Sequence, residues 1–170
     1  TLEDTTLTFT AADFGFSDVN DSPANALQSI VFTTVPATGS LQLSGVAVTA
    51  GQEIAVADIP NLTYDPVADE NGAAYTSFTF QVRDDGGTSD GGVDLDPVAN
   101  TVTIDVTSVN DEPAGADNTV TTLEDTDYTF TAAEFGFTDP NDLPANSLAG
   151  IVITTVPASG SLSLAAGASA

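Results

Sequence analysis

Strict alternation of apolar and polar residues marks two stretches of the chain. Within residues 77–83 the apolar side chains are Phe78, Phe80 and Val82, and residues 101–106 alternate in the same way. Successive side chains of a β-strand point to opposite faces, so a period of two indicates a strand with one buried face. The pattern therefore predicts two half-buried strands, which carry the strongest periodic signals in the sequence.

Shorter apolar runs separated by turn residues fill the rest of the first 110 residues. A short helical turn is expected at residues 11–16, and nothing shows the period of an amphipathic helix. About seven strands in roughly 110 residues are typical of an antiparallel β-sandwich of immunoglobulin-like or cadherin-like plan, so the predicted fold class is all-β. The further strands are predicted at residues 7–10, 30–35, 41–43, 46–48, 53–56 and 62–64, with a turn at residues 57–60.

The chain repeats itself. Residues 1–43 align with residues 122–164 at a constant offset of 121, without a gap, and 31 of the 43 positions are identical. Apolar and acidic positions are both retained, so we expect the two copies to share core and ligand positions. The predicted organisation is a complete repeat at 1–110, an inter-domain linker at 111–118 and the N-terminal part of a second, incomplete repeat at 119–170.

The second copy lacks counterparts of the segment from residue 53 to residue 109. Half of a sandwich cannot bury both of its faces, so two explanations stay open. Either further strands follow in a longer protein, or they come from another chain by strand addition.

The strongly negative charge of the chain limits the classes of partner that it is expected to bind. The sequence has 25 Asp and Glu residues against one basic residue, Arg83, which gives a formal net charge of −24 at pH 7. Nucleic acids and anionic membranes are bound by clustered Lys and Arg, so neither is an expected partner. No apolar run approaches the roughly 20 residues of a spanning helix, and membrane insertion is not expected.

Cysteine and histidine are absent. Disulfides, thiolate or imidazole metal sites and the commonest nucleophile and base pairs are therefore excluded. Carboxylate pairs are plentiful, but no hydroxyl nucleophile with a base and no aromatic sugar platform accompanies them. The chain is not expected to be an enzyme.

Loops rich in Asp, Asn and Gly supply the oxygen ligands that Ca²⁺ prefers. The same residues form ordinary turns, so ligation and turn capping stay open for any single loop. At least one Ca²⁺ per repeat is nevertheless expected, because uncompensated carboxylate clusters would repel one another. Three groups of candidate ligands stand out: Asp18, Asn20 and Asp21 with their repeats Asp139, Asn141 and Asp142; Glu3, Asp4, Asn110, Asp111, Glu112, Asp117, Glu124 and Asp125 around the joint; and Asp84 and Asp85 in a loop that runs to Asp96, with Asp65, Asp69 and Glu70 as candidate additions.

The single arginine follows directly from the strand pattern. Arg83 precedes Asp84 and Asp85 in the sequence, and we expect it to form a structural ion pair there.

Four sequence stretches carry a resemblance to a known family: LEDT at residues 2–5, TVPATGSLQLSGVAVTAGQEI at residues 34–54, FTFQVRDDG at residues 78–86 and VNDEP at residues 109–113. The chain resembles the cadherin-like tandem repeats of very large bacterial surface and secreted proteins, including calcium-dependent adhesins exported by type I secretion. The likeness covers residues 1–117 and the second copy as far as it extends. It implies a modular rod for adhesion or biofilm cohesion.

The resemblance also implies ligand positions. In cadherins an acidic residue near the start of a domain and an exit rich in Asp and Asn bind inter-domain calcium, and Glu3, Asp111 and Glu124 correspond to these positions. The exit here, Asn110 to Pro113, is shorter than the cadherin linker.

These observations lead to one principal hypothesis and two alternatives. The principal one is a calcium-rigidified spacer, an extender or stalk module of a large adhesin, located outside the cell, with neighbouring repeats of the same chain as partners. The first alternative is a subunit of an extracellular filament or surface array, whose repeats are completed by other copies of the protein. A carbohydrate-binding module is disfavoured, because Tyr64, Tyr75 and Tyr128 fall in different strand contexts and form no platform.

Overall fold

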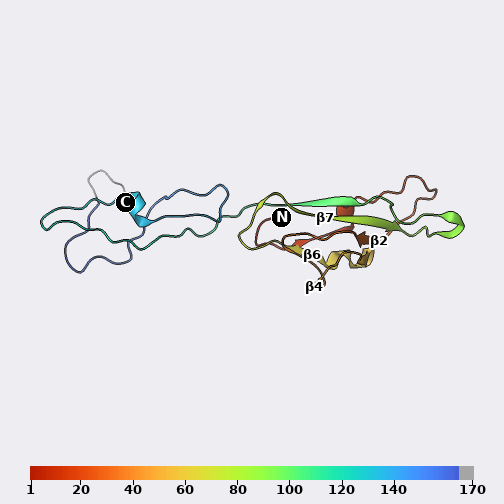
Figure 1. The fold of residues 1–170 in the computed structure, drawn as a ribbon, viewed down its shortest axis with the longest axis horizontal. Helices are drawn as coiled ribbons and strands as arrows, with labels where there is room; N and C mark the ends of the chain where they lie inside the picture. Colours follow the sequence, from red (N-terminus) through yellow and green to blue (C-terminus); the bar gives the residue numbers. More distant parts are fainter. Residues whose placement is uncertain (165–170) are drawn as a thin grey trace.

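The computed structural model describes residues 1–164, and its strands form two antiparallel sheets of four strands each (Figure 1). Short 3₁₀ helices connect them, so the predicted all-β class is confirmed. The first sheet has the order β1 (Leu7–Thr8), β6 (Leu62–Asp65), β3 (Ser40–Leu43) and β4 (Val46–Ala47); the second has the order β5 (Glu53–Ala55), β2 (Leu27–Phe32), β7 (Gly72–Asp84) and β8 (Asn100–Val106). The 3₁₀ helices are η1 (Ala11–Phe14), η2 (Val56–Asn61), η3 (Ser89–Gly91) and η4 (Ala132–Phe135).

The two strands with strict alternation lie side by side. β7 pairs with β8 in antiparallel register, with Phe78 opposite Val102, and Phe78 and Ile104 are almost fully buried. β7 is longer than the alternating stretch predicted, because it continues back to Gly72 across a register shift. Period-two patterning therefore located two neighbouring strands of the second sheet correctly, the inner strand β7 and the edge strand β8.

One apolar cluster joins residues of both sheets. Phe78 lies at its aromatic centre, with ring centroids 5.7 Å from Phe9 and 5.3 Å from Phe32. η1 adds Phe14, which packs edge-to-face on Phe80 at 5.0 Å. The expected helical turn after the first strand is confirmed, and it buries this aromatic side chain.

Several element boundaries differ from the prediction; β2 begins at Leu27 rather than at residue 30, and β1 ends at Thr8 rather than at residue 10. The strand expected at residues 30–35 ends at Phe32, because the N–H groups of Thr33 and Thr34 both donate to the carbonyl oxygen of Thr79 and leave the regular ladder. The turn expected at residues 57–60 lies inside η2, which places Ile59 in the core.

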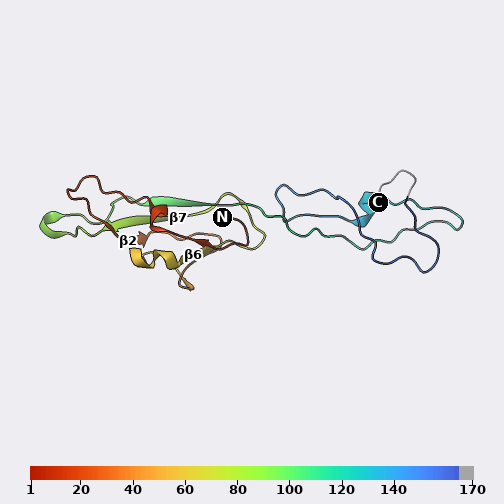
Figure 2. The same cartoon turned by 180° about the vertical axis from the view of Figure 1, so that it is seen from behind.

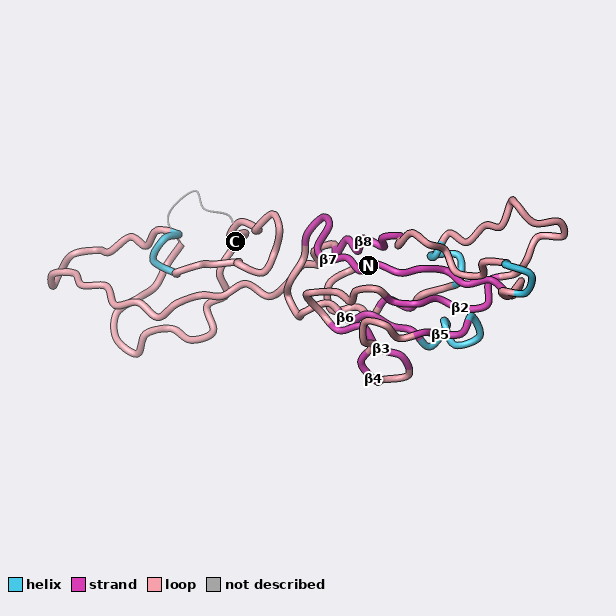
Figure 3. The backbone as a smooth tube through the Cα atoms, turned by 45° about the vertical axis from the view of Figure 1, so that its right-hand side comes forward, coloured by secondary structure: helices cyan, strands magenta, loops and turns pink. Residues whose placement is uncertain are grey.

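The second copy has no comparable core. Figure 3 shows the strands confined to the first copy, and among the described residues after Thr107 the regular structure is η4 and one bridge between Ala114 and Thr138. The expectation of a shared core is wrong for the described part of this copy, since its apolar side chains have no strands like β6 to β8 to pack on. Phe9, Ile30, Phe32 and Leu41 are at most 5% exposed, whereas their counterparts Phe130, Ile151, Ile153 and Leu162 are 44%, 46%, 49% and 45% exposed.

The two copies follow one another along the long axis of the molecule, and Figure 2 shows the same order from behind. None of the helices within residues 1–164 has the length and apolar character that a bilayer crossing requires.

Candidate metal centre between the two copies

Three segments of the first copy meet at the end that faces the second copy. The start of the chain lies beside the end of β8, because Leu2 forms a parallel bridge with Thr107 and the N–H of Glu3 donates to the Thr107 carbonyl oxygen at 3.0 Å. The loop between β6 and β7 reaches the same end, where the N–H of Asp69 faces a carboxylate oxygen of Asp4 at 3.4 Å. We call the surface formed by the chain start, the β6–β7 loop and the segment after β8 the exit end.

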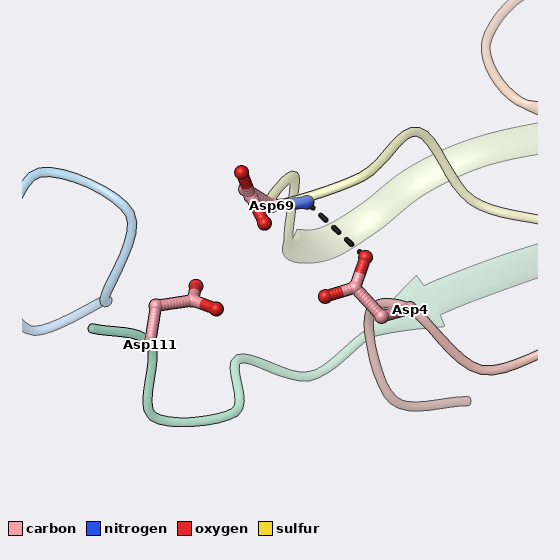
Figure 4. Close-up of side chains that lie close together, drawn as sticks. All are labelled: Asp4, Asp69 and Asp111. Atoms are coloured by element: carbon pink, nitrogen blue, oxygen red, sulfur yellow. Dashed lines mark hydrogen bonds between the residues drawn. The ribbon is translucent and has the colours of Figure 1, made fainter.

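The exit end carries three converging carboxylates, Asp4, Asp69 and Asp111, which we call the acidic triad. Each offers one oxygen, and these oxygens lie within 4.8 Å of one another (Figure 4). Two ligands of one Ca²⁺ at about 2.4 Å from the ion can be at most about 4.8 Å apart, so the spacing fits a shared hard cation. Asp4 and Asp69 both have left-handed backbone conformations, with φ of 54° and 58°, which Asp tolerates better than most residues.

Glu3 fixes the base of the exit end. Its side chain is 1% exposed, and it accepts hydrogen bonds from the backbone N–H of Val109 and from the side-chain amide of Asn71, the latter at 2.9 Å. Burial disfavours its charge, but the hydrogen bonds from Val109, Asn71 and Ser108 outweigh burial and lower the pKa of Glu3 below its ordinary value. The ionised carboxylate therefore ties the start of the chain to the end of β8 and to the β6–β7 loop.

Residues 138–146 of the second copy lie against the exit end, and we call this segment the docking loop. The N–H of Asp111 donates to a carboxylate oxygen of Asp142 at 3.0 Å, and the N–H of Leu143 donates to the Ser108 hydroxyl at 3.2 Å. The further contacts across the joint are Asn141 Nδ2 to Asp69 Oδ2 at 3.2 Å, Asn71 Nδ2 to the Asn141 carbonyl oxygen at 3.4 Å, and Asn146 Nδ2 to Asn110 Oδ1 at 2.9 Å.

Docking buries carboxylates without basic partners. Asp139 and Asp142 are each 6% exposed, and Asp139 Oδ1 and Asp111 Oδ2 are buried without a hydrogen-bond partner. The one basic side chain of the sequence, Arg83, pairs with Glu53 and Asp94 instead. Buried polar atoms in folded proteins nearly always have a partner, so these two oxygens call for a donor or a cation.

The pKa of Asp111 also reflects this lack of positive charge around the buried carboxylates. Its pKa is raised above the ordinary value, first by burial and then by the negative charges of Asp69, Glu3, Asp142 and Asp4. A cation among these carboxylates would reverse the repulsion.

The donor set limits the chemistry. The joint offers carboxylate, amide and carbonyl oxygens and no imidazole or thiolate, which is the ligand type of Ca²⁺ and Mg²⁺ rather than of Zn²⁺ or copper. Several ligands from flexible loops suit the larger coordination number of Ca²⁺ better than the strict octahedron of Mg²⁺. The arrangement can hold an ion and fix three segments.

The structure brings together candidate ligands that belong to two different predicted groups. The joint group supplies Glu3, Asp4, Asn110 and Asp111. The docking-loop residues Asp139, Asn141 and Asp142, expected to form a site within their own repeat, lie against the first copy instead.

Other candidates of the joint group lie apart. Glu112, Asp117, Glu124 and Asp125 are exposed, and their carboxylates form no hydrogen bond within the described residues. Because the start of the first copy lies at its exit end, the equivalent residues Glu124 and Asp125 belong to the opposite end of the second copy from the docking loop. Sequence proximity to the linker was therefore misleading for this pair.

The remaining candidates lie at the far end of the first copy. Asp18, Asn20 and Asp21 are in residues 17–25, which we call the free loop, next to the loop after β7 (Figures 1 and 3). Asp84 Oδ1 accepts from Gly86 N at 2.8 Å and Asp85 Oδ1 from Ala26 N at 2.8 Å, which are turn and loop contacts.

Three additions to that third group also behave differently from expectation. Asp69 joins the acidic triad, Asp65 accepts from the Thr6 hydroxyl, and Glu70 accepts from the Tyr75 hydroxyl. The expected structural ion pair of Arg83 is confirmed, but its partners are not its sequence neighbours Asp84 and Asp85. Successive residues of a strand face opposite sides, and Arg83 contacts Glu53 of β5, across the intervening strand β2, and Asp94 in the loop after β7, each at 2.9 Å.

The sequence reasoning missed Asn71, Ser108 and Asn146 as joint residues. Asn146 repeats Asn25, and this identity between the copies was a usable signal. Asn71 and Ser108 lie in loops. The pairing of β6, β7 and β8 brings these loops close to the joint, and no local sequence pattern indicates this.

Comparisons of the chain with protein-family models, curated proteins and solved structures find no match.

Proposed function

We propose that this chain is a calcium-rigidified spacer made of tandem β-sandwich repeats of immunoglobulin-like or cadherin-like plan. It acts outside the cell as an extender module of a large adhesin. Its work is reach and stiffness, without catalysis. Extracellular Ca²⁺ is millimolar, which matches the affinity of about 10⁻⁴ to 10⁻³ M that is usual for extracellular modules.

The observation that carries the proposal is the joint. The acidic triad combines the start, the β6–β7 loop and the exit of the first copy, and the docking loop adds two buried carboxylates. Buried oxygens without partners at Asp111 and Asp139 add a demand for positive charge. Ca²⁺ bound there would join the two copies through ligands from both and remove the freedom of the linker.

The test is calorimetric titration of metal-free protein with calcium chloride. We expect binding in the range of about 10⁻⁴ to 10⁻³ M, weakened by about tenfold or more in Asp111→Asn, which removes one charged ligand. The matched control is Asp117→Asn, which makes the same change of charge at an exposed linker residue. Equal weakening by the two substitutions, or no binding by the unmodified chain, would overturn the calcium site.

A specific observation also favours a second candidate, a filament subunit completed by strands of another chain. The second copy exposes apolar residues whose counterparts form the core of the first copy: Phe130, Ile151, Ile153 and Leu162 are 44%, 46%, 49% and 45% exposed. A neighbouring chain that supplied strands like β6 to β8 would cover them. Electron microscopy distinguishes the candidates, since the spacer gives separate rods in calcium and the filament subunit gives ordered polymers with or without calcium.

A further inference from the structure

The free loop and the docking loop are the same structure in two different surroundings. In both, the backbone N–H of an Asn donates to the first Asp of the loop, and the side-chain amide of that Asn donates to the second Asp. The distances are 2.7 and 2.9 Å from Asn25 to Asp18 and Asp21, and 2.6 and 2.6 Å from Asn146 to Asp139 and Asp142. The shape of the docking loop is therefore already formed in a loop that has no exit end against it.

The groups that contact the exit end are also present in the free loop. The docking loop uses the side chain and carbonyl oxygen of Asn141, a carboxylate oxygen of Asp142, the N–H of Leu143 and the amide of Asn146. Their counterparts at the offset of 121 residues are Asn20, Asp21, Ser22 and Asn25, so each side-chain donor and acceptor is retained and the one substitution affects only a residue that contributes its backbone.

The two loops differ in exposure. Asp139 and Asp142 are each 6% exposed at the joint, whereas Asp21 is exposed and Asp18 is half-buried. Docking against an exit end thus accounts for the lower exposure of the Asp residues in the docking loop, although the two loops have nearly identical sequences.

We propose that the free loop is a docking surface for the exit end of a second copy of this domain, joined to it by a shared divalent cation. This inference rests on the proposed function, because it assumes that the joint between the two copies of one chain binds calcium. The surface of the partner is the exit end, which the docking loop contacts within one chain: the acidic triad, with Ser108 and Asn110 beside it.

The charges make the cation necessary. Beside the free loop lies an open depression of about 680 Å³, whose lining includes Asp18, Asp21, Asp84, Asp94 and Asp96. An exit end brings three more carboxylates toward these. Two acidic surfaces repel each other, so a cation bound by both would determine whether they associate.

The contact is heterologous, because the free loop and the exit end lie at opposite ends of one domain. Such contacts propagate head to tail into open chains. In the intact chain the exit end is already covered by the docking loop, whose tether acts like a local concentration of about millimolar. The intact chain is therefore expected to remain monomeric at concentrations well below that.

The experiment uses the fragment of residues 1–117, which carries both surfaces uncovered. It is expected to fold alone, because every residue of the apolar core cluster lies between Phe9 and Val106. Analytical ultracentrifugation in calcium chloride should show head-to-tail association that increases with concentration, and a monomer in chelator. Asp21→Ala should weaken association by about tenfold or more, as loss of a buried charged contact does at interfaces.

A second protein keeps the test independent of the fragment. In the intact chain, Asp139→Ala with Asp142→Ala weakens the docking loop, uncovers the exit end and should produce calcium-dependent association, which a third substitution, Asp21→Ala, should abolish. The proposal is overturned if both proteins are monomeric in calcium, or if association persists in chelator or is unaffected by Asp21→Ala. If the unmodified chain binds calcium while these proteins stay monomeric, the docking surface fails and the spacer function stands. If the unmodified chain binds no calcium, both fail.

Discussion

The two copies of the repeat share most of their sequence over 43 positions, yet only the first has a core in the described structure. Phe9 is 3% exposed and packs on Phe78 of β7, whereas its counterpart Phe130 is 44% exposed and contacts Tyr128 and Phe135. The difference teaches that burial here is a property of the strand pairs, because the residues of the repeated segment need β6, β7 and β8 to cover them. The internal structure of the docking loop does not depend on these strands, since the same hydrogen bonds form within the free loop of the first copy.

The largest expected effect contrasts one aromatic position in the two copies. Phe9→Ala should lower the free energy of unfolding by about 3–5 kcal/mol, because it opens a cavity beside Phe78. Phe130→Ala should change it by no more than about 0.5 kcal/mol, as is usual for an exposed site. Denaturant unfolding measures both, and a comparable loss in the two variants would mean that the second copy has a core of its own.

A pair of glycines sharpens the comparison sterically. Gly39 and Gly160 are equivalent, and both have positive φ, 75° and 81°. A Cβ at Gly39 would lie 2.3 Å from the Tyr64 hydroxyl oxygen, while nothing lies within 4 Å of one at Gly160. Gly39→Ala should therefore cost about 2–4 kcal/mol from overpacking and backbone strain, and Gly160→Ala about 1 kcal/mol or less. Thermal unfolding that gives equal losses would contradict the packing around Tyr64.

The equivalent glutamates at the two starts form a third pair. Glu3→Ala leaves the N–H of Val109 and the amide of Asn71 without their acceptor, at a cost of about 1–3 kcal/mol. Glu124→Ala removes an exposed carboxylate and should have almost no effect on unfolding. If the first substitution proved as mild as the second, Glu3 would not be what holds the start of the chain against β8.

The smallest expected effect is a pH dependence that arises at Glu53, in the first copy. The hydroxyl of Ser29 donates to Glu53, and this contact outweighs burial and, with Arg83, lowers the pKa of Glu53. The contact therefore stabilises the fold above the ordinary pKa of 4.5 and is lost as the pH falls through the lowered folded value.

Glu53→Gln should accordingly unfold more readily than the unmodified chain at pH 7, and the two curves should converge in acid. Ser29→Ala, measured alone and with Glu53→Gln, separates the hydroxyl contact from the ion pair. A difference between the curves that is the same at pH 7 and pH 3 would refute the linkage.

Local pattern was enough to predict the all-β fold class and the strands β7 and β8 of the second sheet. The alternation of Phe78 and Phe80 follows directly from the geometry of a pleated strand. The acidic triad was harder, because Asp4, Asp69 and Asp111 lie in three turns far apart in sequence, and only the pairing of β8 with β7 and of the chain start with Thr107 brings them together. Asp69 was grouped with its neighbours in sequence, and nothing local to it indicates the joint.

The docking loop could be predicted in composition but not in place. Its Asp and Asn residues repeat those of the free loop, so the sequence singled them out as candidate ligands. Their contact with the first copy depends on the path of the linker, which brings Asp111 to Asp142 and Asn110 to Asn146. Such a path is a tertiary property that residue types alone do not determine.

The most direct test of the calcium joint is the distribution of distances between spin labels on the two copies, since the chain has no native cysteine to interfere. Labels at Thr49→Cys and Ala133→Cys, both exposed positions, report the orientation of one copy relative to the other. We expect a narrow distribution in millimolar calcium and a broad one in chelator, with Asp111→Asn remaining broad in both. Distributions of equal width with and without calcium would contradict the account.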